Sequence, residues 1–345
     1  MPAPLNMAAH RPQVLRLIDL HGRNAMAFQA LEPGYQYFFD GDQGCVPYVN
    51  TGAAWIATGN PLAPAHTLAT TITNFGAAAT AAGKRWCIFG ADEQLRQACG
   101  ALRSITIGVQ PEWNPQQWTT TVQQHRSVRE QLRRASAKHV TIRHLIGDEL
   151  IAPAMQQTLR GLAQGWLATR PLPAMGFLVQ LDFSSQPDRR QVFVAEHNGA
   201  IVGVANVIPV PARPGWFIKD VLRLPIAPNG TSELLIDAVM RWAAAGDCTW
   251  LTLGLAPLAG DVVASLRWAR RISNRLYNFD GVYQFKTKLR PAAEPALYLL
   301  HPPVRRAPRY LLDAITAFAP DGLWRFGWQA WRRDIALPLR LLQGK

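Results

Sequence analysis

Acidic residues are scarce in this chain, which contains 36 Lys and Arg but only 23 Asp and Glu among its 345 residues. The net charge of +13 reflects missing acids as much as added bases, because only 17% of the residues are charged. Cysteine is sparse as well, and none of the four cysteines forms a C-x-x-C pair: Cys45, Cys87, Cys99 and Cys248. This spacing excludes a zinc ribbon, a redox dithiol and a disulfide framework, and it is typical of proteins in a reducing cytoplasm.

Long apolar runs and metal-ligand patterns are also missing. No stretch of 18 or more uncharged apolar residues occurs, so no transmembrane helix is expected. The N-terminal segment has neither a clean apolar core nor a small-residue cleavage site, so export is not expected. The eight His form no H-x-x-x-H pair and no Cys/His set, and we expect no metal. Apolar residues still make up 48% of the chain, enough for a core, and the length suggests two domains or one large one.

Positive charge is concentrated in three segments. The net charge is +5 in residues 125–144, +6 in residues 266–290 and +5 in residues 303–345, so the remainder is mildly acidic. Clustered bases indicate a polyanionic partner, either nucleic acid or an anionic membrane surface. The alternative interpretation is three solvated helix faces.

The predicted elements divide the chain into two α/β units joined by a helix. Residues 1–121 alternate short apolar runs with helical stretches, as expected for one such unit. Residues 122–147 are predicted to be a basic linker helix whose bases share one face: Arg126, Arg129, Arg133 and Arg134. Residues 148–302 form the second unit, and residues 303–345 a C-terminal tail.

The second unit has the element order of an N-acetyltransferase. A helical stretch is followed by a hairpin with an Asn198-Gly199 turn, a third strand, a loop, a helix and another strand. This order is typical of an N-acetyltransferase-like (GNAT-like) unit, so we expect an α/β (α+β) fold of two tandem GNAT-like lobes with mixed, mostly antiparallel sheets. The glycine-rich pyrophosphate loop of acetyltransferases is missing at Pro228–Gly230, which disfavours coenzyme A.

The C-terminal tail carries a tryptophan stripe. Its members recur at helical spacing on one face, with arginines off that face: Trp324, Trp328, Trp331 and Ile335. The pattern predicts an amphipathic helix that lies in a membrane interface. The alternative is a terminal helix that docks on the protein's own core.

Six segments, in order along the chain, resemble one family. They are HGRNAMAFQALEPGYQYFF (21–39), GNPLAP (59–64), GWLATRPLPAMGF (165–177), KDVLRLPIAPNG (219–230), LTLGLAPLAG (251–260) and YNFDGVYQFKTKLRPAAEPALYLL (277–300). The family is the C-terminal catalytic domain of bacterial phosphatidylglycerol lysyltransferases and alanyltransferases, the multiple peptide resistance factors. Two departures stand out: the sequence contains no segment like the membrane flippase domain that usually precedes this one, so we expect a domain without it, and Ala296 follows Glu294-Pro295 where the family tends to have Arg.

The resemblance implies transfer of an aminoacyl group, lysine or alanine, from tRNA to a lipid hydroxyl, with no cofactor. An aminoacyl-tRNA ester is already activated, so the enzyme must align two anionic substrates, remove a proton and stabilise an oxyanion. Asp220 and Arg223 match the family's active-site Asp-x-x-Arg motif. The resemblance implies that Asp220 holds the α-ammonium group or accepts the hydroxyl proton. It implies that Arg223 binds a phosphate or polarises the ester carbonyl. The alternative is a structural ion pair at a strand end, although an extended chain would point the two side chains to opposite faces.

Five further residues are substrate-binding candidates. Lys286 and Lys288 would share one face of a strand and contact phosphate, or else guard a solvated strand edge. Glu294 would bind an ammonium group or neutralise its basic surroundings. Asn206 and Asn278 would donate hydrogen bonds near the oxyanion, although a structural role is favoured for each.

We therefore expect a tRNA-dependent aminoacyltransferase whose acceptor is phosphatidylglycerol or a related lipid, at the cytoplasmic face of a membrane. Its partners would be aminoacyl-tRNA and an anionic phospholipid surface. The tRNA would be bound by the bases of the predicted linker helix: Arg126, Arg129, Arg133 and Arg134. One alternative acceptor is a peptide or peptidoglycan precursor. A non-catalytic lipid- or RNA-binding relative is a further alternative, which the presence of Asp220, Arg223 and the two lysines disfavours.

Overall fold

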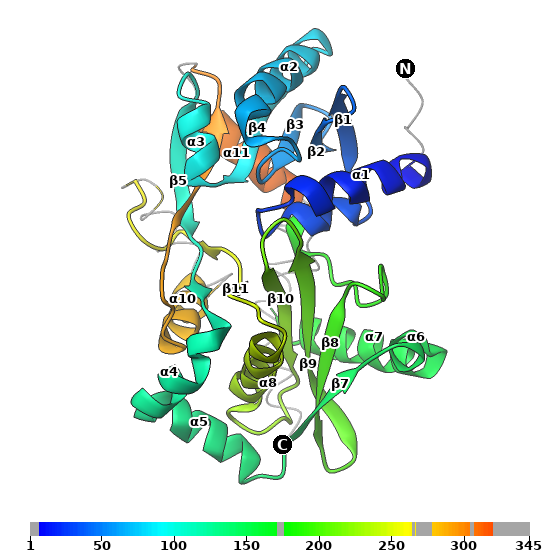
Figure 1. The fold of residues 1–345 in the computed structure, drawn as a ribbon, viewed down its shortest axis with the longest axis vertical. Helices are drawn as coiled ribbons and strands as arrows, with labels where there is room; N and C mark the ends of the chain where they lie inside the picture. Colours follow the sequence, from blue (N-terminus) through cyan, green and yellow to red (C-terminus); the bar gives the residue numbers. More distant parts are fainter. Residues whose placement is uncertain (1–6, 171–175, 264–265, 267–277, 304–306, 320–345) are drawn as a thin grey trace.

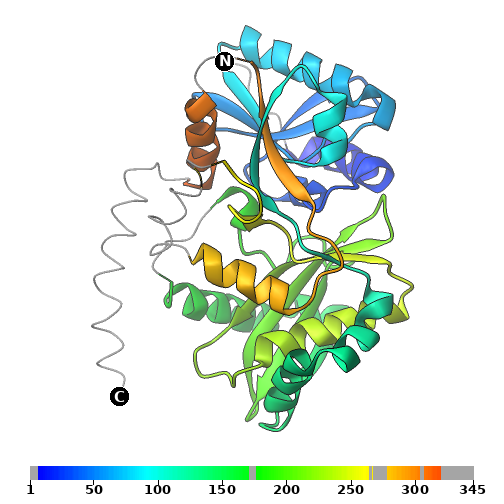
Figure 2. The same cartoon turned by 90° about the vertical axis from the view of Figure 1, so that its left-hand side faces the viewer.

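The structure of the chain is a computed structural model that describes residues 7–170, 176–263, 266, 278–303 and 307–319. Two β-sheets lie one above the other, each with its own helices (Figure 1). A view from the side shows the segments that connect the two sheets running between the upper and lower halves (Figure 2). The predicted fold class, two mixed and mostly antiparallel sheets flanked by helices, is confirmed.

The upper sheet has seven strands in the order β1-β2-β3-β4-β13-β5-β12. Their bounds are β1 (Gln36–Asp40), β2 (Gly44–Asn50), β3 (Ala54–Thr58), β4 (Arg85–Ala91), β5 (Arg103–Val109), β12 (Ala256–Pro257) and β13 (Ala296–His301). Only β3 and β4 are parallel neighbours. The helices of this half are α1 (Met7–His21), η1 (Ala27–Leu31), η2 (Ala65–Thr67), α2 (Leu68–Ala81), α3 (Glu93–Ala98) and α11 (Ala307–Phe318).

The lower sheet has six strands in the order β6-β11-β10-β9-β8-β7. Their bounds are β6 (Glu112–Trp113), β7 (Thr141–Leu145), β8 (Gln191–His197), β9 (Ala200–Val210), β10 (Gly215–Arg223) and β11 (Trp250–Thr252). The helices are η3 (Pro115–Gln117), α4 (Trp118–Gln124), α5 (Arg126–Ser136), α6 (Asp148–Ile151), α7 (Pro153–Leu167), α8 (Thr231–Ala245) and α10 (Phe279–Lys288). One face packs against α8 and α5, whereas the other packs against α7. The short helix η4 (Phe177–Val179) packs against α11 of the upper half.

Sheet membership does not follow the order of the chain. The strands β12 and β13 come from residues 148–302, yet both pair with β5 in the upper sheet. Conversely, β6 belongs to residues 1–121 but pairs with β11 in the lower sheet. The expected linker 122–147 contains β7, an edge strand of the lower sheet. The two sheets are therefore interleaved in sequence, and the chain crosses between them several times.

Local sequence signals explain most of the elements. Asn198 and Gly199 both have positive φ, 51° and 75°, as a two-residue hairpin turn between β8 and β9 requires. The predicted basic helix is interrupted at His125, whose backbone is extended between α4 and α5. All four cysteines are free and buried, as their spacing predicts.

One predicted element is wrong, and another lies outside the described residues. The segment that contains Lys286 and Lys288 was expected to be a strand, but it forms the helix α10. The tryptophan stripe at residues 324–335 falls in the part of the chain that the structure does not describe. Among the described residues, no helix is long and apolar enough to cross a membrane.

Candidate active site

The lower sheet opens between β10 and β11. The two strands pair in parallel over three residues only, Gly215–Phe217 of β10 with Trp250–Thr252 of β11. After Thr252 the chain crosses to the upper sheet, where it forms β12. The strand β10 continues to Arg223, and its pairing with β9 shifts register between Ile218 and Asp220. Asp220 therefore lies where the sheet splits and where the two halves of the molecule meet.

Glycine is required beside this opening. Gly254 has φ +72°, and a Cβ there would lie 2.6 Å from the ring of Phe217. A larger residue would therefore push the segment after β11 away from β10.

Asp220 is buried and held by Asn206 of the neighbouring strand. The Asn206 side-chain N–H donates to Asp220 Oδ2 at 2.7 Å, and its other N–H donates to the Asp182 carbonyl at 3.0 Å. The Asn206 Oδ1 accepts from Arg190 at 2.7 Å. Because a guanidinium can only donate, Arg190 fixes the orientation of the Asn206 amide so that nitrogen faces Asp220. Both N–H bonds of Asn206 are used, so it positions Asp220 and has none left for an oxyanion.

Arg190 is the anchor of this network. Only 2% of Arg190 is exposed, and besides Asn206 it donates to the Ser185 carbonyl, to Ser185 Oγ and to the Asp182 carbonyl. The Asp182 carboxylate caps the turn by accepting from the backbone N–H of Ser184 and Ser185. The segment before β8 is thereby fastened to the face of the sheet that carries Asp220.

A buried ion pair that joins the two halves lies beside Asp220. Lys219 donates to Glu32 Oε1 and to the Gln180 carbonyl, and both charged side chains are at most 3% exposed. The other carboxylate oxygen, Glu32 Oε2, is buried without a hydrogen-bond partner among the described residues. Burial raises the pKa of Glu32 to about 7, and burial also raises the pKa of Asp220. Lys219 opposes both shifts.

Arg223 lies on the opposite face of β10 from Asp220. Its neighbour Val221 packs on the α8 side of the sheet, whereas Leu222 packs on the α7 side. Arg223 donates to the Ala227 carbonyl at 3.0 Å and does not pair with Asp220. The expected separation to opposite faces is confirmed, and the alternative of an ion pair between them is wrong.

Lys286 is buried and does not form the exposed wall of a cleft, which its predicted role requires. Its ammonium group donates to the carbonyls of Leu253, Gly254 and Leu255 at 2.7, 2.9 and 2.8 Å. Burial lowers the pKa of Lys286 to about 7, although three carbonyl acceptors favour the ammonium form. Since all three N–H bonds are used, Lys286 fixes the chain where it leaves β11, and the predicted phosphate contact is wrong for this conformation.

The other candidates near α10 also have partners. Lys288 pairs with Glu233 in the first turn of α8 at 3.1 Å. Asn278 caps α10 by accepting from the Gly281 N–H at 2.8 Å. Glu294 accepts from the Tyr283 hydroxyl at 2.9 Å through Oε2, while its Oε1 is buried without a partner among the described residues. The structure thus brings these four candidates together around α10, apart from the Asp220 network.

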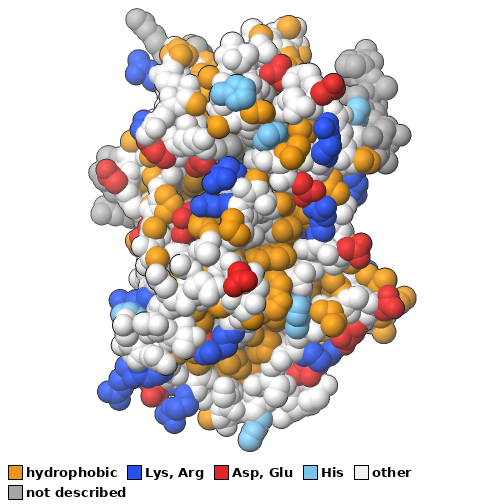
Figure 3. Space-filling view, viewed as in Figure 1, with side chains coloured by type: hydrophobic (Ala, Val, Ile, Leu, Met, Phe, Trp, Pro, Cys, Tyr) orange, Lys and Arg blue, Asp and Glu red, His pale blue; other side chains and the backbone are white. Residues whose placement is uncertain are grey.

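The four arginines of α5 are exposed on the molecular surface. Lys and Arg side chains gather over this helix at the lower left of the space-filling view (Figure 3). Arg129 donates to the Gln123 carbonyl and Arg133 pairs with Glu130, whereas Arg126 and Arg134 have no partner in the described part of the chain. A high positive charge density with few internal ion pairs is typical of a nucleic-acid contact.

The comparison with known families decides the identity of the domain. The family described as "Phosphatidylglycerol lysyltransferase, C-terminal" matches residues 15–301. The chain belongs to this family. Its segments that resemble the phosphatidylglycerol lysyltransferases, including the Asp220 and Glu32 segments, all lie inside the matched range.

Individual relatives agree with this family. The chain is 30% identical over 148 residues to the phosphatidylglycerol lysyltransferase of Bacillus subtilis (strain 168), a match that spans 40% of this chain and only 17% of that relative. The crystal structure of a C-terminal domain from Agrobacterium fabrum, described as a lysylphosphatidylglycerol synthetase, is similar with a TM-score of 0.77 at 20% identity, over 91% of this chain and 98% of that one.

Two further structures are similar in fold. L-PGS from Bacillus licheniformis has a TM-score of 0.75 at 19% identity, over 87% of this chain and 94% of that one. FemX has a TM-score of 0.51 at 10% identity, over 89% of this chain and 98% of that one. These likenesses show that the phosphatidylglycerol lysyltransferase domain shares its fold with L-PGS and, at lower similarity, with FemX.

Sequence reasoning missed three residues of the network around Asp220. Arg190 follows Arg189 in a polar segment, where an exposed basic pair is the ordinary expectation. Lys219 directly precedes Asp220, and Glu32 is the one acidic residue of the segment 21–39, so their place in these segments of the phosphatidylglycerol lysyltransferase family was the available signal. Among the described residues, no three His, Cys, Asp or Glu side chains form a metal site.

Proposed function

We propose that this chain transfers an aminoacyl group, lysine or alanine, from tRNA to a hydroxyl of phosphatidylglycerol at the inner face of the membrane. The observation that supports this most directly is a buried Asp220, oriented by Asn206, at the opening of the lower sheet in a phosphatidylglycerol lysyltransferase domain. The exposed arginines of α5 fit a tRNA contact. A lipid acceptor fits the family to which the chain belongs.

Asp220 would act as the general base. Its Oδ2 accepts from Asn206, and in the proposed reaction its other oxygen, Oδ1, accepts the proton of the acceptor hydroxyl. As that hydroxyl oxygen bonds to the ester carbonyl carbon, its proton passes to Asp220. The ribose oxygen of tRNA then leaves and takes the proton. Burial raises the pKa of Asp220, which makes its carboxylate a stronger base than an exposed one.

The remaining candidates would bind the two substrates. In the proposed function Arg223 grips a phosphate at the end of β10, and Glu294 binds an amino or hydroxyl group through its unpartnered oxygen. Lys286, Lys288, Asn206 and Asn278 would act indirectly, because their polar atoms hold elements of the protein.

Lipid mass spectrometry tests the function and its acceptor together. Cells that express the chain should contain phosphatidylglycerol with an added lysyl or alanyl mass, and cells without it should not. An unchanged lipid profile, together with an aminoacylated peptide or peptidoglycan precursor, would overturn the lipid acceptor and support the alternative one.

The α5 surface gives a prediction for tRNA binding. Replacing Arg126 and Arg134 by Gln should weaken binding at low salt and reduce the slope of log Kd against log[salt] by about two, since each lost phosphate contact lowers it by about one. A salt titration by filter binding measures this slope.

The matched control removes the same charge elsewhere. Replacing Arg103 and Arg160, which are exposed and have no partner among the described residues, should leave the slope within experimental error. Wild-type binding that does not depend on salt would contradict a phosphate contact at α5.

A further inference from the structure

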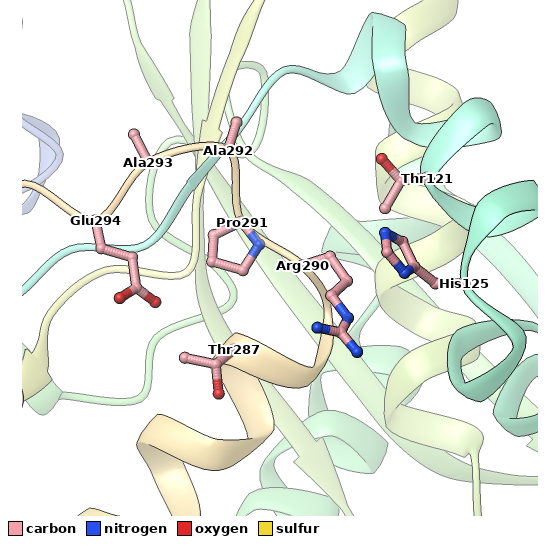
Figure 4. A pocket seen from close by; sticks show the side chains of 8 residues that line it. All are labelled: Thr121, His125, Thr287, Arg290, Pro291, Ala292, Ala293 and Glu294. Atoms are coloured by element: carbon pink, nitrogen blue, oxygen red, sulfur yellow. The ribbon is translucent and has the colours of Figure 1, made fainter.

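A pocket of about 540 Å³ lies between the α4–α5 junction and the segment that leads from α10 to β13 (Figure 4). Its lining is polar on several sides: Thr121, His125, Thr287, Arg290, Pro291, Ala292, Ala293 and Glu294. The Glu294 carboxylate lies on one side, and the Arg290 guanidinium and the His125 ring lie on the other (Figure 4). We infer that this pocket binds one nucleotide of the unpaired 3′ end of tRNA, an inference that rests on the proposed function.

Three polar groups of the pocket have no protein partner. Arg290 is exposed, and neither its guanidinium nor the His125 ring makes a hydrogen bond or ion pair with a described residue. The Oε1 atom of Glu294 is buried without a partner, although Oε2 is held by Tyr283. An unsatisfied buried acceptor destabilises the folded protein. A ligand that donates to Glu294 and carries negative charge toward Arg290 satisfies all three groups.

A nucleotide has both features. Its phosphate matches the arginine, and its hydroxyl and amino groups donate hydrogen bonds of the kind that Glu294 lacks. The planar side chains of Arg290 and His125 are groups on which unpaired RNA bases stack. The volume lies in the range of about 300–1,000 Å³ that is usual for small-ligand pockets.

The pocket continues into the basic surface of α5. His125 precedes Arg126, the first residue of α5, and Arg126 is exposed without a partner among the described residues. The end of an RNA whose phosphates lie along α5 would therefore reach the pocket. This continuity favours an RNA end over a free mononucleotide, which would not contact α5.

The pocket also lies beside the opening of the lower sheet. Ala293 pairs with Glu112, Glu112 pairs with Thr252, and Thr252 pairs with Phe217. Three strand spacings of about 4.8 Å, or about 14 Å in all, therefore separate Ala293 from Phe217. The chain runs in the same direction from Ala293 to Glu294 as from Phe217 toward Asp220. Glu294 and Asp220 thus lie beyond the same edge of this row.

The experiment measures whether Arg290 and the RNA end act together. Affinities of wild type and Arg290→Gln are compared for intact tRNA and for tRNA without its three unpaired 3′ nucleotides, at one salt concentration. We expect truncation to weaken wild-type binding about tenfold and Arg290→Gln to weaken intact tRNA about tenfold. Truncation of the tRNA should then weaken binding to Arg290→Gln less than twofold. Glu294→Gln should show the same loss of sensitivity, and Arg160→Gln should behave as wild type.

Several results would overturn the inference. If truncation costs Arg290→Gln the same tenfold, or if neither change alters affinity, the RNA end does not occupy the pocket. If AMP binds the pocket without competing with intact tRNA, the site belongs to a free nucleotide. Thermal unfolding confirms that each variant is folded. Lipid aminoacylation is measured separately. If the effects of Arg290→Gln and of truncation depend on each other but no aminoacyl group reaches lipid, only the proposed function is refuted. If lipid is aminoacylated but the two effects are independent, only the pocket assignment is refuted.

Discussion

Replacing Asp220 by Asn should lower the rate of aminoacyl transfer by a factor of about 10²–10⁴, the usual contribution of a general base. The amide has the shape of the carboxylate, and its oxygen still accepts from Asn206, so the network around Arg190 stays in place. Transfer of labelled amino acid from tRNA to extracted lipid measures the rate. The exposed Asp188 provides the control, since Asp188→Asn removes the same charge away from the network.

The same variant should not lose stability. Burial raises the pKa of Asp220, so the folded protein binds its proton more tightly than the unfolded chain, and ionisation above pH 3.8 destabilises the native state. The neutral amide removes that cost, and thermal unfolding should show an unchanged or higher Tm. In wild type, the transfer rate should fall as the pH is lowered through the raised pKa. Turnover of Asp220→Asn within threefold of wild type would remove Asp220 from the catalytic mechanism.

Replacing Lys286 by Met should destabilise the protein by about 3 kcal/mol, because buried carbonyls that lose their donors each cost about 1–3 kcal/mol. Methionine fills much of the same volume, so the loss reports the three hydrogen bonds to Leu253, Gly254 and Leu255. Urea denaturation measures the free energy of unfolding.

The control for this prediction is Lys138→Met at an exposed position after α5, which should change stability by less than about 0.5 kcal/mol. If Lys286→Met proved as stable as wild type but lost affinity for tRNA or lipid, Lys286 would be a phosphate ligand that the present conformation occupies with carbonyls.

Elements that depend on local signals could be predicted from the sequence. The β8–β9 hairpin follows from Asn198-Gly199, because these residues accept the positive φ that the turn needs. The helix α10 was taken for a strand because FKTK alternates apolar and polar residues over a short window. Asn278 as N-cap and Asp280 in the first turn were the signals for a helix.

The candidate site was predictable only in part. Asp220 and Arg223 were found through a motif, and their separation to opposite faces follows from the period of a strand. The partners of Asp220 could not be found in this way, because Arg190 reaches Asn206 from the segment before β8 and Glu32 comes from the other half of the molecule. Such contacts depend on tertiary pairing, for which a single sequence carries no periodic signal.

The place of β13 has a consequence for biosynthesis. This strand lies between β4 and β5, yet Ala296 leaves the ribosome long after both neighbours have emerged. Until then the nascent chain presents two bare strand edges, which readily pair with other chains. The upper half therefore cannot mature cotranslationally from its N-terminus, and a polypeptide that stops before Ala296 should require a chaperone to stay out of aggregates.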